Sequence, residues 1–201
     1  MYMLRKVLLT AAFVVLGTGA AYASGAHDGM QCTGCHNIHY AKAPIIFEVA
    51  ANDKAMPAGS DKSSKMVAPL CLGCHADADK GGMGILPVSA HTTHPFGKKV
   101  NKKVANVPDG LLRDGIMDCV SCHDPHPSNP NHKYLRVDTK GGKNMAEFCD
   151  LCHPAKVDKS VNRGALKVFD SMDEVKGAYS VPVNEMAGAA ASAPAVVPAK
   201  K

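Results

Sequence analysis

The eight cysteines of this chain all occur in Cys-x-x-Cys pairs, and a histidine directly follows each pair. Two thiols three residues apart lie on the same side of a helical turn, and a histidine four residues after the first thiol points the same way. The pattern therefore predicts four copies of one short binding unit. The cysteines are Cys32, Cys35, Cys71, Cys74, Cys119, Cys122, Cys149 and Cys152, and the histidines are His36, His75, His123 and His153.

The spacing within each unit is the attachment signature of a c-type haem. The two thiols form thioethers with the vinyl groups of one haem, and the histidine binds the iron as the proximal ligand. We therefore predict four covalently bound c-type haems as the cofactors. Disulfides and zinc sites built from two cysteine pairs are the alternatives, but neither requires a histidine after every pair.

The large side chains that usually fill a protein core are scarce. The chain has no Trp and 5% aromatic residues, but it has 18 Gly and 13 Pro among its 201 residues. Because glycine and proline interrupt regular elements, we expect mostly coil, with a few short α-helices wrapped around a stack of four haems and little or no β-sheet. The short helices are expected at residues 45–51 and 145–153, and an amphipathic helix at residues 161–176.

The N-terminal residues have the pattern of a secretory signal peptide. Arg5 and Lys6 precede an apolar run at residues 7–16, and the small residues Ala21 and Ala23 suit a cleavage site. The run is short for a membrane-spanning helix, so an uncleaved anchor is the less favoured alternative. We predict that residues 1–23 are removed, and that the mature chain has no membrane span and is exported to the periplasm, the cell surface or the extracellular space.

An internal repeat divides the rest of the chain. Each half contains two binding units separated by a lysine-rich connection, so each half is interpreted as a pair of haems. The predicted organisation is a tetrahaem cytochrome c domain at residues 24–160, with haem doublets at 32–75 and 119–153 joined by 76–118, and a C-terminal segment at 161–201 that ends in a disordered Ala/Pro-rich tail.

The charge pattern bears on the partners of the chain. The formal net charge is +5, and the predicted signal peptide holds two of the basic residues. The remaining lysines are scattered and form no basic stripe of the kind that follows a nucleic acid backbone. We therefore expect no nucleic acid among the partners.

Six further histidines remain to supply the sixth ligands of the iron atoms. Two of them follow a motif histidine by three residues, so their imidazoles leave the turn at a different angle and can reach a neighbouring haem. Methionine is the competing ligand type and would raise the reduction potential. The predicted distal ligands are His39, His94 and His126, His91 and His27 compete for the fourth position, and His132 is the expected spare.

The segment Cys119-Val-Ser-Cys-His-Asp-Pro-His126, followed by Tyr134-Leu135-Arg136 and the unit at Cys149, resembles the doubled Cys-x-x-Cys-His domain of multihaem c-type cytochromes. His94-Pro95-Phe96-Gly97 is similar to a His-Pro-x-Gly element of that group. The resemblance covers residues 24–160 and implies a small multihaem cytochrome c fold. The chain also resembles the OmcE-type outer-surface tetrahaem cytochromes of metal-reducing bacteria. Members of that type polymerise into filaments, and in related filaments one haem takes an axial histidine from the next subunit.

The function predicted from these features is electron transfer along four bis-histidine haems, with no catalytic residues. Bis-histidine ligation closes both faces of the iron, so no substrate can bind there. The expected partners are redox proteins or extracellular electron acceptors, and a homopolymer in the filament form. A haem enzyme that reduces a small oxyanion or a metal ion at an open iron is the alternative, and a subunit dedicated to one enzyme complex is a third interpretation.

Overall fold

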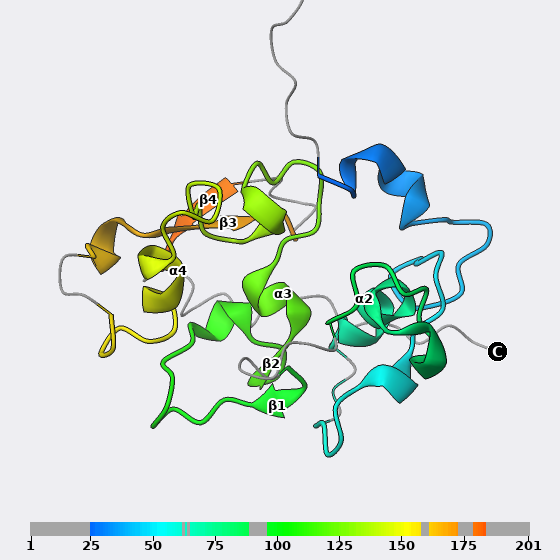
Figure 1. The fold of residues 1–201 in the computed structure, drawn as a ribbon, viewed down its shortest axis with the longest axis horizontal. Helices are drawn as coiled ribbons and strands as arrows, with labels where there is room; N and C mark the ends of the chain where they lie inside the picture. Colours follow the sequence, from blue (N-terminus) through cyan, green and yellow to red (C-terminus); the bar gives the residue numbers. More distant parts are fainter. Residues whose placement is uncertain are drawn as a thin grey trace, which may run out of the picture.

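The computed structural model describes residues 25–61, 63, 65–88, 96–157, 161–172 and 179–183. Most of this chain is coil and turns between short regular elements (Figure 1), as the glycine and proline content predicts. The predicted signal peptide and the Ala/Pro-rich tail lie outside the described residues. The helices are α2 (Ala68–His75), α3 (Cys119–Cys122) and α4 (Ala146–Asp150), and the strands are β1 (Lys98–Lys99), β2 (Ile116–Met117), β3 (Lys167–Asp170) and β4 (Tyr179–Pro182).

Two antiparallel strand pairs form the sheet structure of the described residues. They are short and separate, so the prediction of little β-sheet is confirmed. In β1 and β2, Lys98 pairs with Met117 and Lys99 with Ile116; in β3 and β4, the register runs from Lys167 with Pro182 to Asp170 with Tyr179.

The amphipathic helix predicted at residues 161–176 is wrong, because β3 occupies the middle of that segment. Lys167 is exposed and Val168 is fully buried, which is the alternation of a strand rather than of a helix. The backbone N–H of Phe169 donates a hydrogen bond of 2.7 Å to the carbonyl of Arg136. A distant segment therefore helps to hold these β-branched and aromatic residues in the extended conformation they favour.

The two short helices predicted elsewhere have different outcomes. The helix predicted at residues 145–153 forms only in part, as α4, which ends at Asp150 and not at Pro154. The helix predicted at residues 45–51 is wrong. Ile45 and Ile46 have φ values of 60° and 48°, which lie outside the helical region, and an antiparallel bridge joins His36 to Phe47.

Buried apolar side chains form two small clusters rather than one central core. The larger cluster lies in the C-terminal half, and the smaller one lies between α2 and α3. The stack of four haems that we expect at the centre stays a prediction. The larger cluster contains Val107, Leu111, Leu112, Val137, Leu151, Leu166, Val168 and Val183; the smaller contains Ala43, Val67, Leu70 and Val120.

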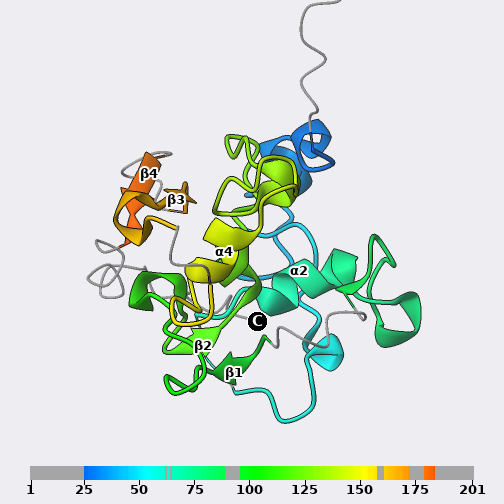
Figure 2. The same ribbon diagram turned by 60° about the vertical axis from the view of Figure 1, so that its left-hand side comes forward.

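The helices that carry the second and third motifs lie next to each other, with α2 in contact with α3. The N-terminal turn, shown in blue, lies beside the loop that follows α3 when the molecule is turned (Figure 2). A search of the described residues for a helix long and apolar enough to cross a membrane found none.

Candidate haem-binding site

Each Cys-x-x-Cys-His motif is folded into one helical turn. The second motif lies within α2, and in the other three motifs the backbone N–H of the histidine donates to the carbonyl of the first cysteine. The turn places both thiols and the imidazole on one side of the backbone. The N···O distances are 2.7 Å for His36 to Cys32, 3.0 Å for His123 to Cys119 and 2.9 Å for His153 to Cys149.

A backbone carbonyl orients the imidazole of every motif histidine. In each case the carbonyl accepts a hydrogen bond from Nδ1–H, which leaves the lone pair of the neutral ring on Nε2. This is the arrangement that fixes the tautomer and the ring orientation of a metal-binding histidine. The Nδ1···O distances are 3.0 Å for His36 to Ile45, 2.7 Å for His75 to Ile85, 2.9 Å for His123 to Lys133 and 3.2 Å for His153 to Val104.

The loops that supply these carbonyls have an unusual backbone. For the first three motifs the carbonyl lies nine or ten residues after the histidine. Residues other than glycine adopt positive φ at or beside it, which costs on the order of 1–3 kcal/mol each. Much of the backbone strain therefore lies where the histidines of the first three motifs are oriented. These residues are Ile45 (60°), Ile46 (48°), Leu86 (43°), Lys133 (53°) and Tyr134 (55°).

Exposed apolar side chains gather around the motifs. Three of the four residues whose carbonyls bind a motif histidine are themselves apolar and exposed: Ile45 by 44%, Ile85 by 49% and Val104 by 56%. Ile38 and Leu86, close to the first and second motifs, are exposed by 74% and 79%. Apolar surface of this kind marks a binding site, and it fits a large apolar cofactor such as haem.

The thiols of the first three motifs lie close together. The Cys71 and Cys119 thiols hydrogen-bond to each other, and this contact together with burial raises the pKa of Cys119 well above its usual value. Burial also raises the pKa of Cys35, with a smaller contribution from the neighbouring Cys74 and Cys71. All eight cysteines lie in the described part of the chain, and none of them forms a disulfide.

The placement of the metal-binding side chains bears on the zinc alternative. Among the described residues, no group of three or more His, Cys, Asp and Glu side chains is placed to hold a metal ion. Each motif instead presents one oriented imidazole beside two thiols, which is the donor set for haem attachment.

Asp118 joins the second and third motifs. Its buried carboxylate accepts hydrogen bonds from the backbone N–H groups of Val67 (2.7 Å), at the start of α2, and Cys119 (2.6 Å), at the start of α3. Its own N–H donates to Ser121 Oγ (2.9 Å), which completes a capping box. Burial raises the pKa of the Asp118 carboxyl, although the bonds from Val67 and Cys119 act against this. One side chain therefore caps both helices.

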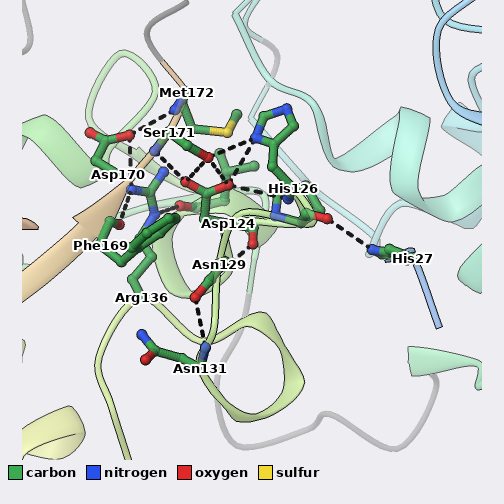
Figure 3. A network of polar contacts seen from close by, with 12 residues as sticks. His27, Asp124, His126, Asn129, Asn131, Arg136, Phe169, Asp170, Ser171 and Met172 are labelled. Atoms are coloured by element: carbon green, nitrogen blue, oxygen red, sulfur yellow. Dashed lines mark hydrogen bonds and ion pairs between the residues drawn. The ribbon is translucent and has the colours of Figure 1, made fainter. Parts of the chain in front are cut away.

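His126 lies in a polar network beside the third motif (Figure 3). Its Nδ1 is 2.9 Å from Asp124 Oδ1 and 3.1 Å from Ser171 Oγ. The Asp124 side chain is fully buried and also accepts from the backbone N–H of Ser171 (2.6 Å). Burial acts to raise the pKa of Asp124, but the hydrogen bonds from His126 and Ser171 lower it below its usual value. The carboxylate thus orients His126 as the carbonyls orient the motif histidines.

The buried side chain of Arg136 ties this network to α3 and β3 (Figure 3). Its Nε donates to the Val120 carbonyl (2.6 Å), and its Nη1 donates to the Phe169 carbonyl (3.1 Å) and lies 3.3 Å from Asp170 Oδ1. Arg136 therefore fixes the third motif against the C-terminal strand pair.

The other predicted distal ligands are placed differently. His27 contacts the rings of His75 and Tyr134, and burial lowers its pKa. His39 is exposed beside Tyr40, and His132 begins a short 3-10 helix. Within the described part of the chain, neither ring has a hydrogen-bonding partner. His91 and His94 lie outside the described residues.

Residues 112–158, which contain the third and fourth motifs, match a family model described as a doubled CXXCH motif. This match supports a multihaem c-type cytochrome. It indicates binding of haem c, which is attached outside the cytoplasm, and it favours an electron carrier over an enzyme. Among curated proteins and solved structures, nothing matches the chain.

Several residues that shape the site are not predicted from the sequence. The pattern Asp118-x-x-Ser121, which overlaps the start of the third motif, is a capping signal that could have been found. The sequence His123-Asp124-Pro125-His126 places a carboxylate between two histidines, but its burial cannot be seen from the sequence. The residues whose backbone carbonyls bind the motif histidines share no side-chain type by which the sequence could identify them.

Proposed function

We propose that the chain is an electron carrier with four c-type haems, each attached through one Cys-x-x-Cys pair and bound by the histidine that follows. The observation that carries this proposal is the shared orientation of the four motif histidines, each with Nδ1 on a backbone carbonyl. When bound, haem supplies one-electron redox chemistry at its iron. The chain supplies attachment, ligand orientation and an apolar surround.

The sixth ligands complete this proposal. His126 is the best supported of them, because Asp124 and Ser171 hold its Nδ1 and leave Nε2 for a metal. We assign His39, His94 and either His91 or His27 to the other positions, so that every iron has two histidine ligands. With both faces closed, the haems exchange electrons and bind no substrate.

The proposed place of action is outside the cytoplasm, with redox proteins or extracellular electron acceptors as partners. We also propose that the chain polymerises into a filament. This part of the proposal rests on the resemblance to OmcE-type cytochromes. Negative-stain electron microscopy of haem protein sheared from cells, with size-exclusion chromatography of the same sample, tests it. Regular thin filaments that contain this chain would support a polymer, and discrete particles of monomer size would overturn it.

A direct test of electron transfer uses the purified haem-loaded chain. We expect full reduction by dithionite, full reoxidation by a soluble acceptor, and no binding of carbon monoxide to the reduced protein. Carbon monoxide bound to the untreated wild type would reveal an open iron and would favour the enzyme alternative.

Replacing Asp124 with asparagine should raise the reduction potential of one haem. A carboxylate on Nδ1 makes the imidazole a stronger donor and favours ferric iron. If the variant loses a tenfold preference for the ferric state, the reduction potential of that haem rises by about 59 mV, because the couple transfers one electron. Spectropotentiometric titration of the wild type and the variant measures the shift.

Asp138→Asn is the matched control for this experiment. Like Asp124, Asp138 has a carboxylate that accepts a hydrogen bond from a nearby backbone N–H. Unlike Asp124, it is exposed and forms an ion pair with Lys140. Its replacement should leave all potentials unchanged. Equal potentials in the Asp124 variant and the wild type would contradict the assignment of His126 as an oriented ligand.

A further inference from the structure

His27, in the N-terminal turn, lies against the histidine of the second motif. The ring centroids of His27 and His75 are 5.8 Å apart, and their planes are inclined by 56°. Two imidazoles that bind one metal ion from opposite sides, each through a nitrogen about 2 Å from the metal, have ring centres roughly 6 Å apart. From this juxtaposition we propose that His27 is the sixth ligand of the haem attached to Cys71 and Cys74, opposite His75 and within the same chain.

The orientation of the His27 ring matches that of the motif histidines. Its Nδ1 donates to the carbonyl of Pro125 at 3.3 Å, so the lone pair of the neutral ring lies on Nε2. Within the described part of the chain, the rings of His39 and His132 have no such bond. A backbone carbonyl on Nδ1 is therefore common to His27 and the four proximal ligands.

Tyr134 anchors the segment that carries His27. Its hydroxyl accepts hydrogen bonds from the backbone N–H groups of His27 (3.0 Å) and Asp28 (3.2 Å), and it donates to Asp28 Oδ1 (2.8 Å). Its ring also stacks on His27, with centroids 5.0 Å apart and planes inclined by 17°. Three hydrogen bonds and a ring contact hold the imidazole beside His75, although 107 residues separate His27 from Tyr134.

The same loop serves two motifs. Lys133 supplies the carbonyl that orients His123, and the adjacent Tyr134 holds His27 beside His75. Both residues have positive φ. The loop therefore positions a proximal ligand of the third motif and the sixth ligand of the second, and it does so in cis rather than through a neighbouring subunit.

The inference rests on the proposed function, and its test separates the two. Covalent haem is first counted in the wild type by the pyridine haemochrome method. A wild type without covalent haem would overturn the proposed function itself. With haem present, carbon monoxide titration of the reduced His27→Ala monomer should show one newly open haem per chain, and added imidazole should restore its low-spin spectrum.

His132→Ala is the matched control, because it removes a histidine beside Tyr134 that has no hydrogen-bonding partner in the described residues. It should leave the spectrum unchanged. If His27→Ala also binds no carbon monoxide, the inference is overturned while the proposed function stands. Carbon monoxide binding that appears in the wild type on dilution would assign the ligand to a second chain and would overturn ligation in cis.

A second variant tests the pairing of His27 with His75. His75→Met alone and His27→Ala alone should each remove one bis-histidine haem, counted by near-infrared magnetic circular dichroism. The double variant should also lose one if both histidines serve the same iron, whether the altered haem is retained or lost. Loss of two bis-histidine haems in the double variant would place His27 on a different iron and would overturn the pairing.

Discussion

Replacing Cys119 and Cys122 together with alanine is expected to remove one covalent haem and to loosen the centre of the molecule. The haem count should fall by one, and the Soret absorbance per chain by about a quarter, because each pair holds one haem. The effect should extend beyond the third motif, since Cys119 contacts Cys71 and α3 packs against α2. Haem counting and thermal unfolding followed by circular dichroism measure both consequences.

Val120→Ala is the matched control for the cysteine variant. Val120 lies between Cys119 and Cys122 in the sequence, and its side chain is buried in the smaller apolar cluster. Its truncation therefore lowers stability but removes no atom that attaches haem. The control should keep the wild-type haem count. An unchanged haem count in the double cysteine variant would contradict attachment at the third motif.

Asp118→Ala should lower the free energy of unfolding by about 4 kcal/mol. The buried amide of Val67 and the partly buried amide of Cys119 would both lose their acceptor, and each such group left unsatisfied costs about 1–3 kcal/mol. These two hydrogen bonds are also the caps of the helices, so this cost already includes the loss of the caps. Denaturant titration of the haem-loaded protein measures the change in the free energy of unfolding.

Asp53→Ala provides the comparison for this substitution. Asp53 is exposed in the first turn of a short 3-10 helix, and surface changes of this kind alter stability by about 0.5 kcal/mol or less. Equal stability of the Asp118 and Asp53 variants would show that the shared cap does not hold α2 and α3 together.

The sequence predicts the local structure of the motifs because their chemistry is local. The turn from Cys32 to His36 and the helix around Cys149 depend on residues four apart in the chain. The loop after the first motif is different. The sequence predicts a helix at residues 45–51, but the carbonyl of Ile45 binds His36 and the backbone turns to positive φ. Propensity fails there because a tertiary contact determines the conformation.

In the candidate site, too, only the contacts between residues close in sequence can be predicted. The proximal histidines follow from their spacing alone, whereas their hydrogen-bonding partners do not. Val104 precedes His153 by 49 residues and contributes only its backbone carbonyl, which every residue possesses. The contact of His27 with Tyr134 spans a still longer stretch of chain. Such pairings depend on the path of the coil, and coil has no periodicity from which its path can be predicted.

The number of covalent haems per chain tests the central claim most directly. Intact-mass spectrometry of the exported protein, combined with the pyridine haemochrome method, gives this number without any substitution. We predict four, one for each Cys-x-x-Cys-His motif. A count of two would limit haem attachment to half of the motifs, and a chain that is free of haem and has disulfides or zinc in its place would contradict the account as a whole.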